Sequence, residues 1–232
     1  MANVLMILSA ADHWTLKDGS QHPTGFWAEE FVAPYEVFTD AGWSVTVATP
    51  GGRTPSVDQA SLDEGAGDPE TLQHVRASLD RLAQVLEAPT DLASVDHNDF
   101  DVVFYPGGHG PMEDLAEDKT SGAILRDRVS AGKHVALLCH APAAVLAASD
   151  DASSSPFAGY KMTGFSNDEE EQVGLAANAP WLLEDKLVEL GADYSKAPEP
   201  WGSHVVVDRN VYTGQNPQSS EELAKRIVSD LG

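Results

Sequence analysis

Cys139, the only cysteine in the chain, is placed where a thiol could act as a nucleophile. The apolar run from Val135 to Leu138 predicts a short buried strand, and Ala141 onward predicts a helix with a proline in its first turn, where a missing N–H does no harm. A residue on such a corner sits in a tight, often strained turn at the carboxyl end of a sheet. The positive end of the helix dipole favours ionisation there. We therefore predict that Cys139 is a nucleophile with an easily ionised thiol.

Composition indicates a single domain. The chain has 232 residues, 42% of them hydrophobic and 22% charged, which is enough for one sizeable core. It contains no run of about 18 apolar residues, and its first eight residues lack a basic segment, so we expect no membrane span, no signal peptide and a cytoplasmic location. One cysteine cannot form an internal disulfide, so the fold needs no oxidising compartment.

The charge balance excludes some partners. Lys and Arg number 14 against 37 Asp and Glu, a net charge of −23, and the acids are spread along the chain. Such a field repels phosphate backbones and anionic lipids, so we expect no nucleic-acid partner and no membrane partner. Scattered acid also keeps a protein soluble in concentrated salt. A salt-adapted host and an ordinary acidic cytosolic protein both fit this pattern.

Strands and helices alternate along the chain. We expect strands at 3–9, 42–50, 101–106, 135–138, 205–208 and 211–217, and helices at 22–38, 69–86, 121–131, 141 onward, 181–190 and 220–231. Pro34 predicts a kink or break in the first helix, the last helix has a capping-type start, and the Ser- and Asp-rich stretch 149–156 predicts a break. The alternation predicts an α/β fold, a mostly parallel sheet with helices on both faces. We interpret residues 1–232 as one domain with a covering insertion around 53–98.

Four of the loops after predicted strands carry candidate site residues. They are the loop 10–21, the segment Gly107 to Gly110, the Cys139 corner, and the segment Gly214 to Pro217. Active sites in parallel sheets lie at the carboxyl ends of the strands. Glycine lets the backbone approach a ligand closely, so the N–H groups of Gly108 and His140 are candidates to hold an oxyanion. An ordinary tight turn is the plainer interpretation of the two glycines.

Five motifs, in order along the chain, resemble those of a known family. They are Thr24-Gly25 with Glu30 and Pro34, Tyr105-Pro106-Gly107-Gly108-His109-Gly110, Leu138-Cys139-His140, Thr163-Gly164-Phe165, and Thr213-Gly214-Gln215-Asn216-Pro217. By these motifs the chain resembles the ThiJ/PfpI (DJ-one) superfamily. Within it the chain is similar to the glyoxalase III branch, which is chaperone-related and class I glutamine amidotransferase-like. The resemblance implies a flavodoxin-like three-layer sandwich with a nucleophile elbow, and a homodimer.

The resemblance also implies roles for individual residues. Cys139 matches the family nucleophile and His140 its neighbour in the catalytic triad. The acid that meets the thiol lies four residues before the proline of the first helix, which is Glu30 here. The third triad member is an acid shortly after the Thr-Gly-Phe segment, which spacing places at Glu170. Asp168, Glu169 and Glu171 lie beside it, and which of the four orients His140 stays open.

The implied reaction converts methylglyoxal and water to D-lactate without a cofactor. A thiolate adds to the aldehyde, a proton moves between the two carbons, and the thioester that results is hydrolysed. We expect Trp14, His22, His109 and Trp201 to hold the small dicarbonyl substrate. We expect no metal site, because His13, His22, His109 and His204 are isolated in the sequence.

Other activities in the same superfamily are alternatives. They are a holding chaperone, a protein or nucleotide deglycase, a cysteine peptidase and an amidotransferase-like protein. A chaperone needs exposed apolar surface, which a net charge of −23 disfavours. An amidotransferase would be expected to carry its His and Glu together late in the chain, whereas His140 follows Cys139 directly. A peptidase needs room for a chain, and the segment 53–98 suggests a small closed pocket.

Overall fold

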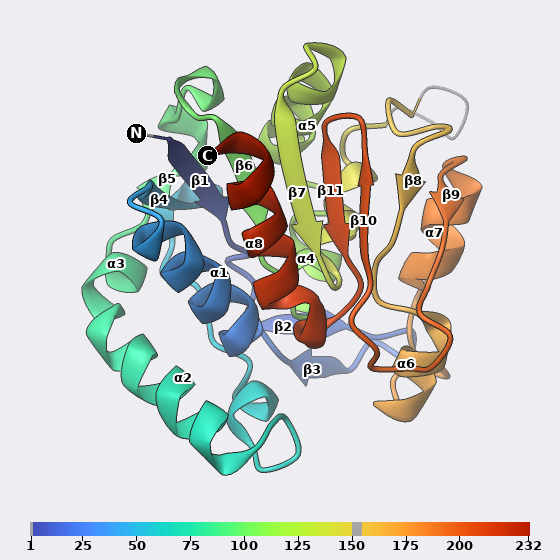
Figure 1. The fold of residues 1–232 in the computed structure, drawn as a ribbon. Coiled ribbons are helices and arrows are strands. Elements are labelled where there is room, and N and C mark those ends of the chain that lie inside the picture. The colour runs from blue at the N-terminus through green and yellow to red at the C-terminus, as the bar shows by residue number, and fades with distance from the viewer. Residues whose placement is uncertain (1, 150–154) are drawn as a thin grey trace.

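Seven strands form one central sheet in a computed structural model, which describes residues 2–149 and 155–232 (Figure 1). The order across the sheet is β10-β11-β7-β6-β1-β4-β5. Neighbouring strands are parallel except β10 and β11, which pair antiparallel at one edge. The strands are β1 Asn3–Ile7, β4 Ser44–Thr49, β5 Thr90–Asp91, β6 Val102–Tyr105, β7 His134–Leu138, β10 Val205–Asp208 and β11 Val211–Gly214.

Helices cover both faces of this sheet, which explains why its central strands are apolar throughout. Helix α1 (Ala28–Asp40) and helix α8 (Ser220–Leu231) lie side by side on one face, and α5 (Lys119–Ser130) lies on the other (Figure 1). The connections β1-α1-β4 and β6-α5-β7 run toward opposite edges, so right-handed crossovers place their helices on opposite faces. All four residues of β6 are fully buried. The predicted α/β sheet, mostly parallel with helices on both faces, is confirmed.

The remaining elements are short or lie at the edges of the sheet. Strands β2 (His13–Thr15) and β3 (Gln21–Pro23) form an antiparallel pair, and β8 (Lys161–Met162) and β9 (Asp193–Tyr194) form a parallel pair. The other helices are α2 Pro69–Arg81, α3 Ala83–Glu87, α4 Gly110–Glu113, α6 Asn167–Gln172 and α7 Leu183–Glu189. None of the helices in the described part of the chain combines the length and apolarity that a membrane crossing requires.

Two expectations about the first helix are wrong. The helix begins at Ala28 rather than at residue 22, because His22 and Pro23 belong to β3 and pair with β2. It also runs through Pro34 without a break. The missing N–H removes one bond of the helix, but Pro34 is buried and α1 packs against α8, α2 and β4. Tertiary packing supplies most helical stability in proteins, and here it outweighs the lost bond.

Three other predicted elements differ in detail. The helix expected over 69–86 is divided at Leu82, whose φ of −93° and ψ of 4° redirect the chain so that Leu86 becomes buried. The helix expected after Cys139 is a single 3₁₀ segment, η5 (Ala141–Val145). The capping-type start of α8 is wrong, since the Ser219 hydroxyl bonds Asn216 and a backbone carbonyl instead. Most of the break predicted at 149–156 lies outside the described residues, which omit 150–154.

Candidate active site

Cys139 occupies the corner directly after β7, in a left-handed backbone conformation with φ of 58°. This conformation costs about 1 kcal/mol for a residue other than glycine. Hydrogen bonds on both sides hold it: the Cys139 N–H donates to the Gly214 carbonyl at 2.8 Å, and the Phe165 N–H donates to the Cys139 carbonyl at 2.9 Å. The strained corner expected from the sequence is therefore present, and two of the recognised motifs meet there.

Glu30 reaches the corner from the first turn of α1. The start of this helix is tied to the loop after β6, because the Trp27 N–H donates to the Gly107 carbonyl at 3.1 Å. In the same loop the Gly107 N–H donates to Glu30 Oε2 at 2.8 Å. A Cβ at Gly107 would lie 2.7 Å from Glu30 Oε2 and 2.8 Å from the Cys139 Cβ, so a larger residue there would push the carboxyl and the cysteine apart.

Burial sets the protonation of the carboxyl and the thiol. It raises the pKa of Glu30 to about 8, against the lowering effect of hydrogen bonds with Cys139 and Gly107. Glu30 Oε1 is buried and has no partner by hydrogen-bond geometry within the described residues. Burial and the nearby Glu30 charge also raise the pKa of Cys139 well above its usual value, while the Gly108 N–H acts to lower it. At neutral pH both groups hold their protons.

The expectation of an easily ionised thiol is therefore wrong for the resting site. Cys139 is only 3% exposed, and the element that follows it is five residues of 3₁₀ helix rather than a long α-helix with a strong dipole. Removal from water disfavours the charged thiolate, and this effect dominates. The thiol needs a base beside it to react.

His140 provides such a base. Its Nδ1 lies 3.3 Å from the Cys139 Sγ, and its Nε2 lies 2.8 Å from Glu170 Oε2. Burial lowers the pKa of His140 to about 4, so the ring is neutral at pH 7. Although burial acts to raise the pKa of Glu170, the two neighbouring histidines hold it well below its usual value. With its Nε2–H donated to this carboxylate, His140 presents the Nδ1 lone pair to the thiol.

The acidic run 168–171 separates into different environments. Glu170 is 3% exposed and contacts His140, whereas Asp168 pairs with Lys196 at 2.8 Å near the surface. Glu171 is exposed. Glu169 is fully buried on the other side of α6 and does not bond His140. Of the four acids left open by the sequence, the one in contact with His140 is Glu170.

Glu169 is a structural residue that sequence reasoning missed. It forms a capping box with Ser166, accepting from the backbone N–H and the hydroxyl of that residue. It also accepts bonds from the backbone N–H of Trp201 and from the side-chain amides of Gln215 and Asn216. One buried carboxylate thus joins α6 to the loops at 201 and 215. Its sequence signal was Ser166 three residues earlier, the spacing of a capping box.

His109 is not isolated, contrary to expectation. Its Nε2 lies 2.8 Å from Glu170 Oε1, and its ring centroid lies 4.0 Å from that of His140. His109, His140 and Glu170 carry ligand atoms within 4.8 Å of one another, so these three residues could hold a metal ion. Each histidine Nε2, however, already bonds its own carboxylate oxygen. We interpret the three residues as a hydrogen-bonded acid–base group.

A narrow pocket with a volume of about 30 Å³ opens onto the sulfur. Of the residues expected to hold substrate, His109 and Trp201 line it and Trp14 and His22 do not. Trp14 is 1% exposed and stacks on His109 at 5.2 Å, and His22 meets the edge of His109 at 6.1 Å. The complete lining is Trp27, Gly108, His109, Cys139, His140, Phe165, Val173, Trp201 and Pro217.

Gly108 brings the backbone against the sulfur. Its φ is 90°, and a Cβ there would lie 2.5 Å from the Gly25 carbonyl oxygen and 2.6 Å from the Trp27 nitrogen. Only glycine fits this turn, which aims the Gly108 N–H at Cys139. The Cys139 N–H is already committed to Gly214, so Gly108 is the better-placed oxyanion donor.

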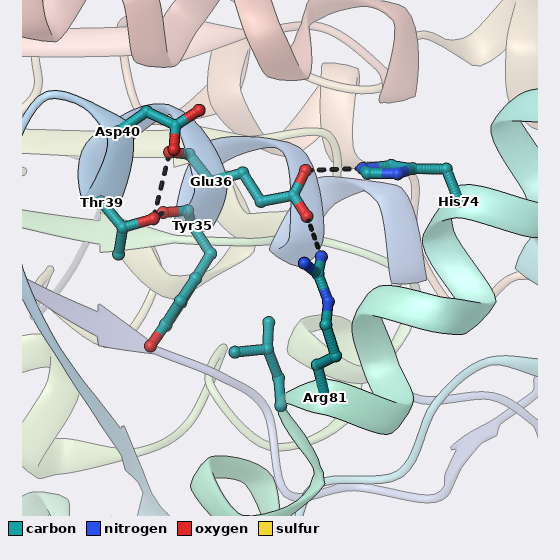
Figure 2. Close-up of a pocket in the computed structure, with 7 residues that line it drawn as sticks. Tyr35, Glu36, Thr39, Asp40, His74 and Arg81 are labelled. Carbon is teal, nitrogen blue, oxygen red and sulfur yellow. Dashed lines mark hydrogen bonds and ion pairs between the residues drawn. The ribbon is translucent and has the colours of Figure 1, made fainter.

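A second pocket lies between α1 and α2 and is built by a structural network (Figure 2). Glu36 accepts hydrogen bonds from His74, Ser78 and Arg81 at 2.7 to 2.8 Å. Although partial burial acts to raise it, the bonds from His74 and Ser78 and the charge of Arg81 hold the pKa of Glu36 below its usual value. Since every oxygen of Glu36 is engaged by these donors, we interpret the network as a clamp between the two helices.

Replacing Glu36 by alanine is expected to lower the free energy of unfolding by about 1 kcal/mol at pH 7, since the pairs are largely exposed. Urea unfolding measures it, with Glu189→Ala, which removes an exposed surface pair, as the control. Because the pKa of Glu36 is lowered by folding, its contribution is present at neutral pH and the difference should shrink as pH falls through that pKa. An unchanged difference in acid would contradict the clamp.

The fold and this corner define the class: a flavodoxin-like α/β protein with a buried cysteine at a strand end. The model of the DJ-1/PfpI family matches residues 23–230, and the chain belongs to this family. Glyoxalase 3 of Candida albicans is 28% identical over 99% of this chain and 98% of its own. The protein/nucleic acid deglycase HchA of Staphylococcus aureus is 28% identical over 98% and 79%. The structure of the Rapid Encystment Protein of 24 kDa from Francisella tularensis covers both chains fully, at 31% identity and a TM-score of 0.86.

Proposed function

We propose that this chain is a glutathione-independent glyoxalase that converts methylglyoxal and water to D-lactate without a cofactor. The observation that carries the proposal is the buried row Glu30, Cys139, His140 and Glu170, in which a thiol lies between a protonated carboxyl and a neutral imidazole. The similarity to Glyoxalase 3 over almost the whole chain supports the same reaction.

The first step joins substrate to sulfur. The Cys139 thiol gives its proton to Nδ1 of His140, 3.3 Å away, and the sulfur bonds the aldehyde carbon. The carbonyl π bond breaks, and the negative oxygen is held by the Gly108 N–H until it is protonated. The product of this step is a hemithioacetal. Glu170 stabilises the imidazolium that forms on His140, because its carboxylate accepts the Nε2–H.

The second step moves a proton along the substrate. A base removes the hydrogen on the thiol-bound carbon, giving an enediol, and an acid delivers a proton to the neighbouring carbon. The result is a thioester with an unchanged number of electrons. His140 and Glu30 flank the sulfur and are the proton carriers for this step. Water then attacks the thioester, the carbon–sulfur bond breaks, lactate leaves, and the sulfur recovers its proton.

The narrow site favours a free dicarbonyl over a peptide. About 30 Å³ next to the sulfur holds only a few atoms, which agrees with a two-carbon reacting unit. A deglycase would begin with the same attack on a carbonyl adduct, and the Staphylococcus relative makes it the alternative. The holding chaperone, the peptidase and the amidotransferase-like protein are less supported, because none of them needs this acid–thiol–base row in so small a pocket.

The test is direct. Purified protein incubated with methylglyoxal, without glutathione, is expected to produce D-lactate in proportion to enzyme and time. Lactate must be measured by a chiral assay, because loss of methylglyoxal alone also follows from adducts with arginine or lysine. Glycated N-acetylarginine in a parallel reaction separates the deglycase alternative. Release of free N-acetylarginine with no lactate from methylglyoxal would reject the proposal.

The cytoplasmic location and the homodimer implied by the resemblance stay predictions. So does the absence of nucleic-acid and membrane partners, which the net charge of −23 supports.

A further inference from the structure

A second hollow of about 330 Å³ opens directly outside the Cys139 pocket. The two share four lining residues, Trp27, Val173, Trp201 and Pro217, so the hollow is a vestibule continuous with the pocket. None of the residues that line the vestibule carries a charge. This is notable on a chain with a net charge of −23, whose acids are spread along its whole length.

Val173 is an exposed apolar residue at this mouth. It is 42% exposed, and Val188 at 56% is the other large exposed apolar side chain within the described residues. Val188 lies in α7 and lines neither pocket, whereas Val173 lines both. An apolar side chain left in water beside a reactive centre offers area that a substrate can bury.

Trp201 faces Val173 across the vestibule in a strained but fixed conformation. Its φ is 65°, a left-handed conformation that costs a tryptophan about 1 to 2 kcal/mol. Two bonds to α6 hold it: the backbone N–H donates to Glu169 Oε1 at 2.9 Å, and the indole Nε1–H donates to Gln172 Oε1 at 2.6 Å. With both its polar groups used, Trp201 presents an apolar ring.

The wall of the vestibule is connected to the acid–base group. The Trp201 ring packs on Phe165 at 5.5 Å, and Phe165 packs on His140 at 4.2 Å. Helix α6 carries Glu170, which bonds His140, and ends at Val173. A group seated between Trp201 and Val173 would therefore extend from the carbon that reacts at Cys139.

We infer that the vestibule binds the substituent of larger 2-oxoaldehydes, so that the substrate class is R–CO–CHO with R apolar or aromatic. This rests on the proposed function. The two carbonyl carbons would occupy the small pocket and R the uncharged vestibule. The balance is unchanged: R–CO–CHO and water give R–CHOH–COOH through the same sulfur adduct, with no oxidant or reductant.

The experiment compares methylglyoxal with phenylglyoxal, whose ring is the probe for the vestibule. The variants are Val173→Glu and the matched control Val188→Glu, which adds the same charge at the other exposed valine. We expect the ratio of kcat/KM for phenylglyoxal to that for methylglyoxal to fall about tenfold in Val173→Glu relative to Val188→Glu, because the ring must then contact a carboxylate. Comparing ratios between variants cancels the intrinsic reactivities of the two aldehydes.

A second variant keeps the result clear if Val173→Glu is poorly folded. Gln218→Glu puts a nearly isosteric charge in the vestibule from a different element and should shift the ratio in the same direction. Ratios within about twofold of the control in both folded variants would overturn the inference, since a pocket contact is worth more than that. Turnover of methylglyoxal but not phenylglyoxal by the parent would overturn it too, leaving the proposed function intact. Turnover of neither would reject both.

Discussion

Replacing Cys139 by serine is expected to reduce D-lactate formation from methylglyoxal on the order of 10³-fold or more, because the hydroxyl cannot replace the thiol as nucleophile. The His140 Nδ1 that lies 3.3 Å from the sulfur would still be available. Its basicity is too low, with a pKa of about 4, to ionise an alcohol whose proton is far more tightly held. Initial rates of lactate formation, with enzyme in large excess over the parent assay, measure the residual activity.

The loss has to be separated from unfolding. Serine is nearly isosteric with cysteine and keeps the strained φ of 58°, so the melting temperature should change by only a few degrees. Turnover by Cys139→Ser at the parent rate would end the enzyme proposal. If the parent and Cys139→Ser suppress aggregation of a client protein equally well, the holding-chaperone alternative gains instead.

The second large effect is expected from Glu30→Gln. The amide fills the same space between Gly107 and the sulfur but cannot exchange a proton with the substrate, so kcat/KM should fall about 10² to 10⁴-fold. Glu29→Gln is the matched control, because Glu29 is adjacent in the same helix and about 100° round it, away from the sulfur. Equal losses in both variants would show that a general electrostatic change, not the carboxyl at the sulfur, caused the effect.

The pH dependence gives Glu30 a separate signature. Since burial raises its pKa to about 8, the protonated form that the reaction uses is present below that pH and lost above it. Activity of the parent and of Glu29→Gln should therefore decline as pH rises through about 8. The residual activity of Glu30→Gln should lack this decline. A decline at the same pH in Glu30→Gln would assign the titration to another group.

Stability should move in a direction that activity does not. Folding raises the pKa of Glu30 from 4.5 to about 8, so between those values the folded chain binds a proton that the unfolded chain does not. The free energy of unfolding of the parent then falls as pH rises through this window. Glu30→Gln has no such proton, and its stability relative to the parent should increase from pH 5 to pH 8. Thermal melts at several pH values measure this, and a variant that is inactive yet relatively more stable cannot owe its inactivity to unfolding.

The sequence alone determined the architecture and most of the site. Alternating apolar strands and amphipathic helices specify a parallel sheet, and the loops after successive strands meet at one edge of it. For this reason Cys139, His140, Glu30 and Gly108 could be named before the structure, and the structure brings them together. These features are local: a buried strand, a turn that only glycine permits, and a helix start are each encoded within a few residues.

Only the tertiary structure decided the environment of each group. The acids at 168–171 are indistinguishable along the chain, yet Glu170 bonds two histidines while Glu169 bonds Trp201 and two distant amides. His109 looked isolated because its partner lies 61 residues away. The thiol was expected to ionise easily, and burial reverses that expectation. Each of these outcomes depends on how much water is excluded and on which side chains from remote segments fill the space, and residue spacing carries no record of either.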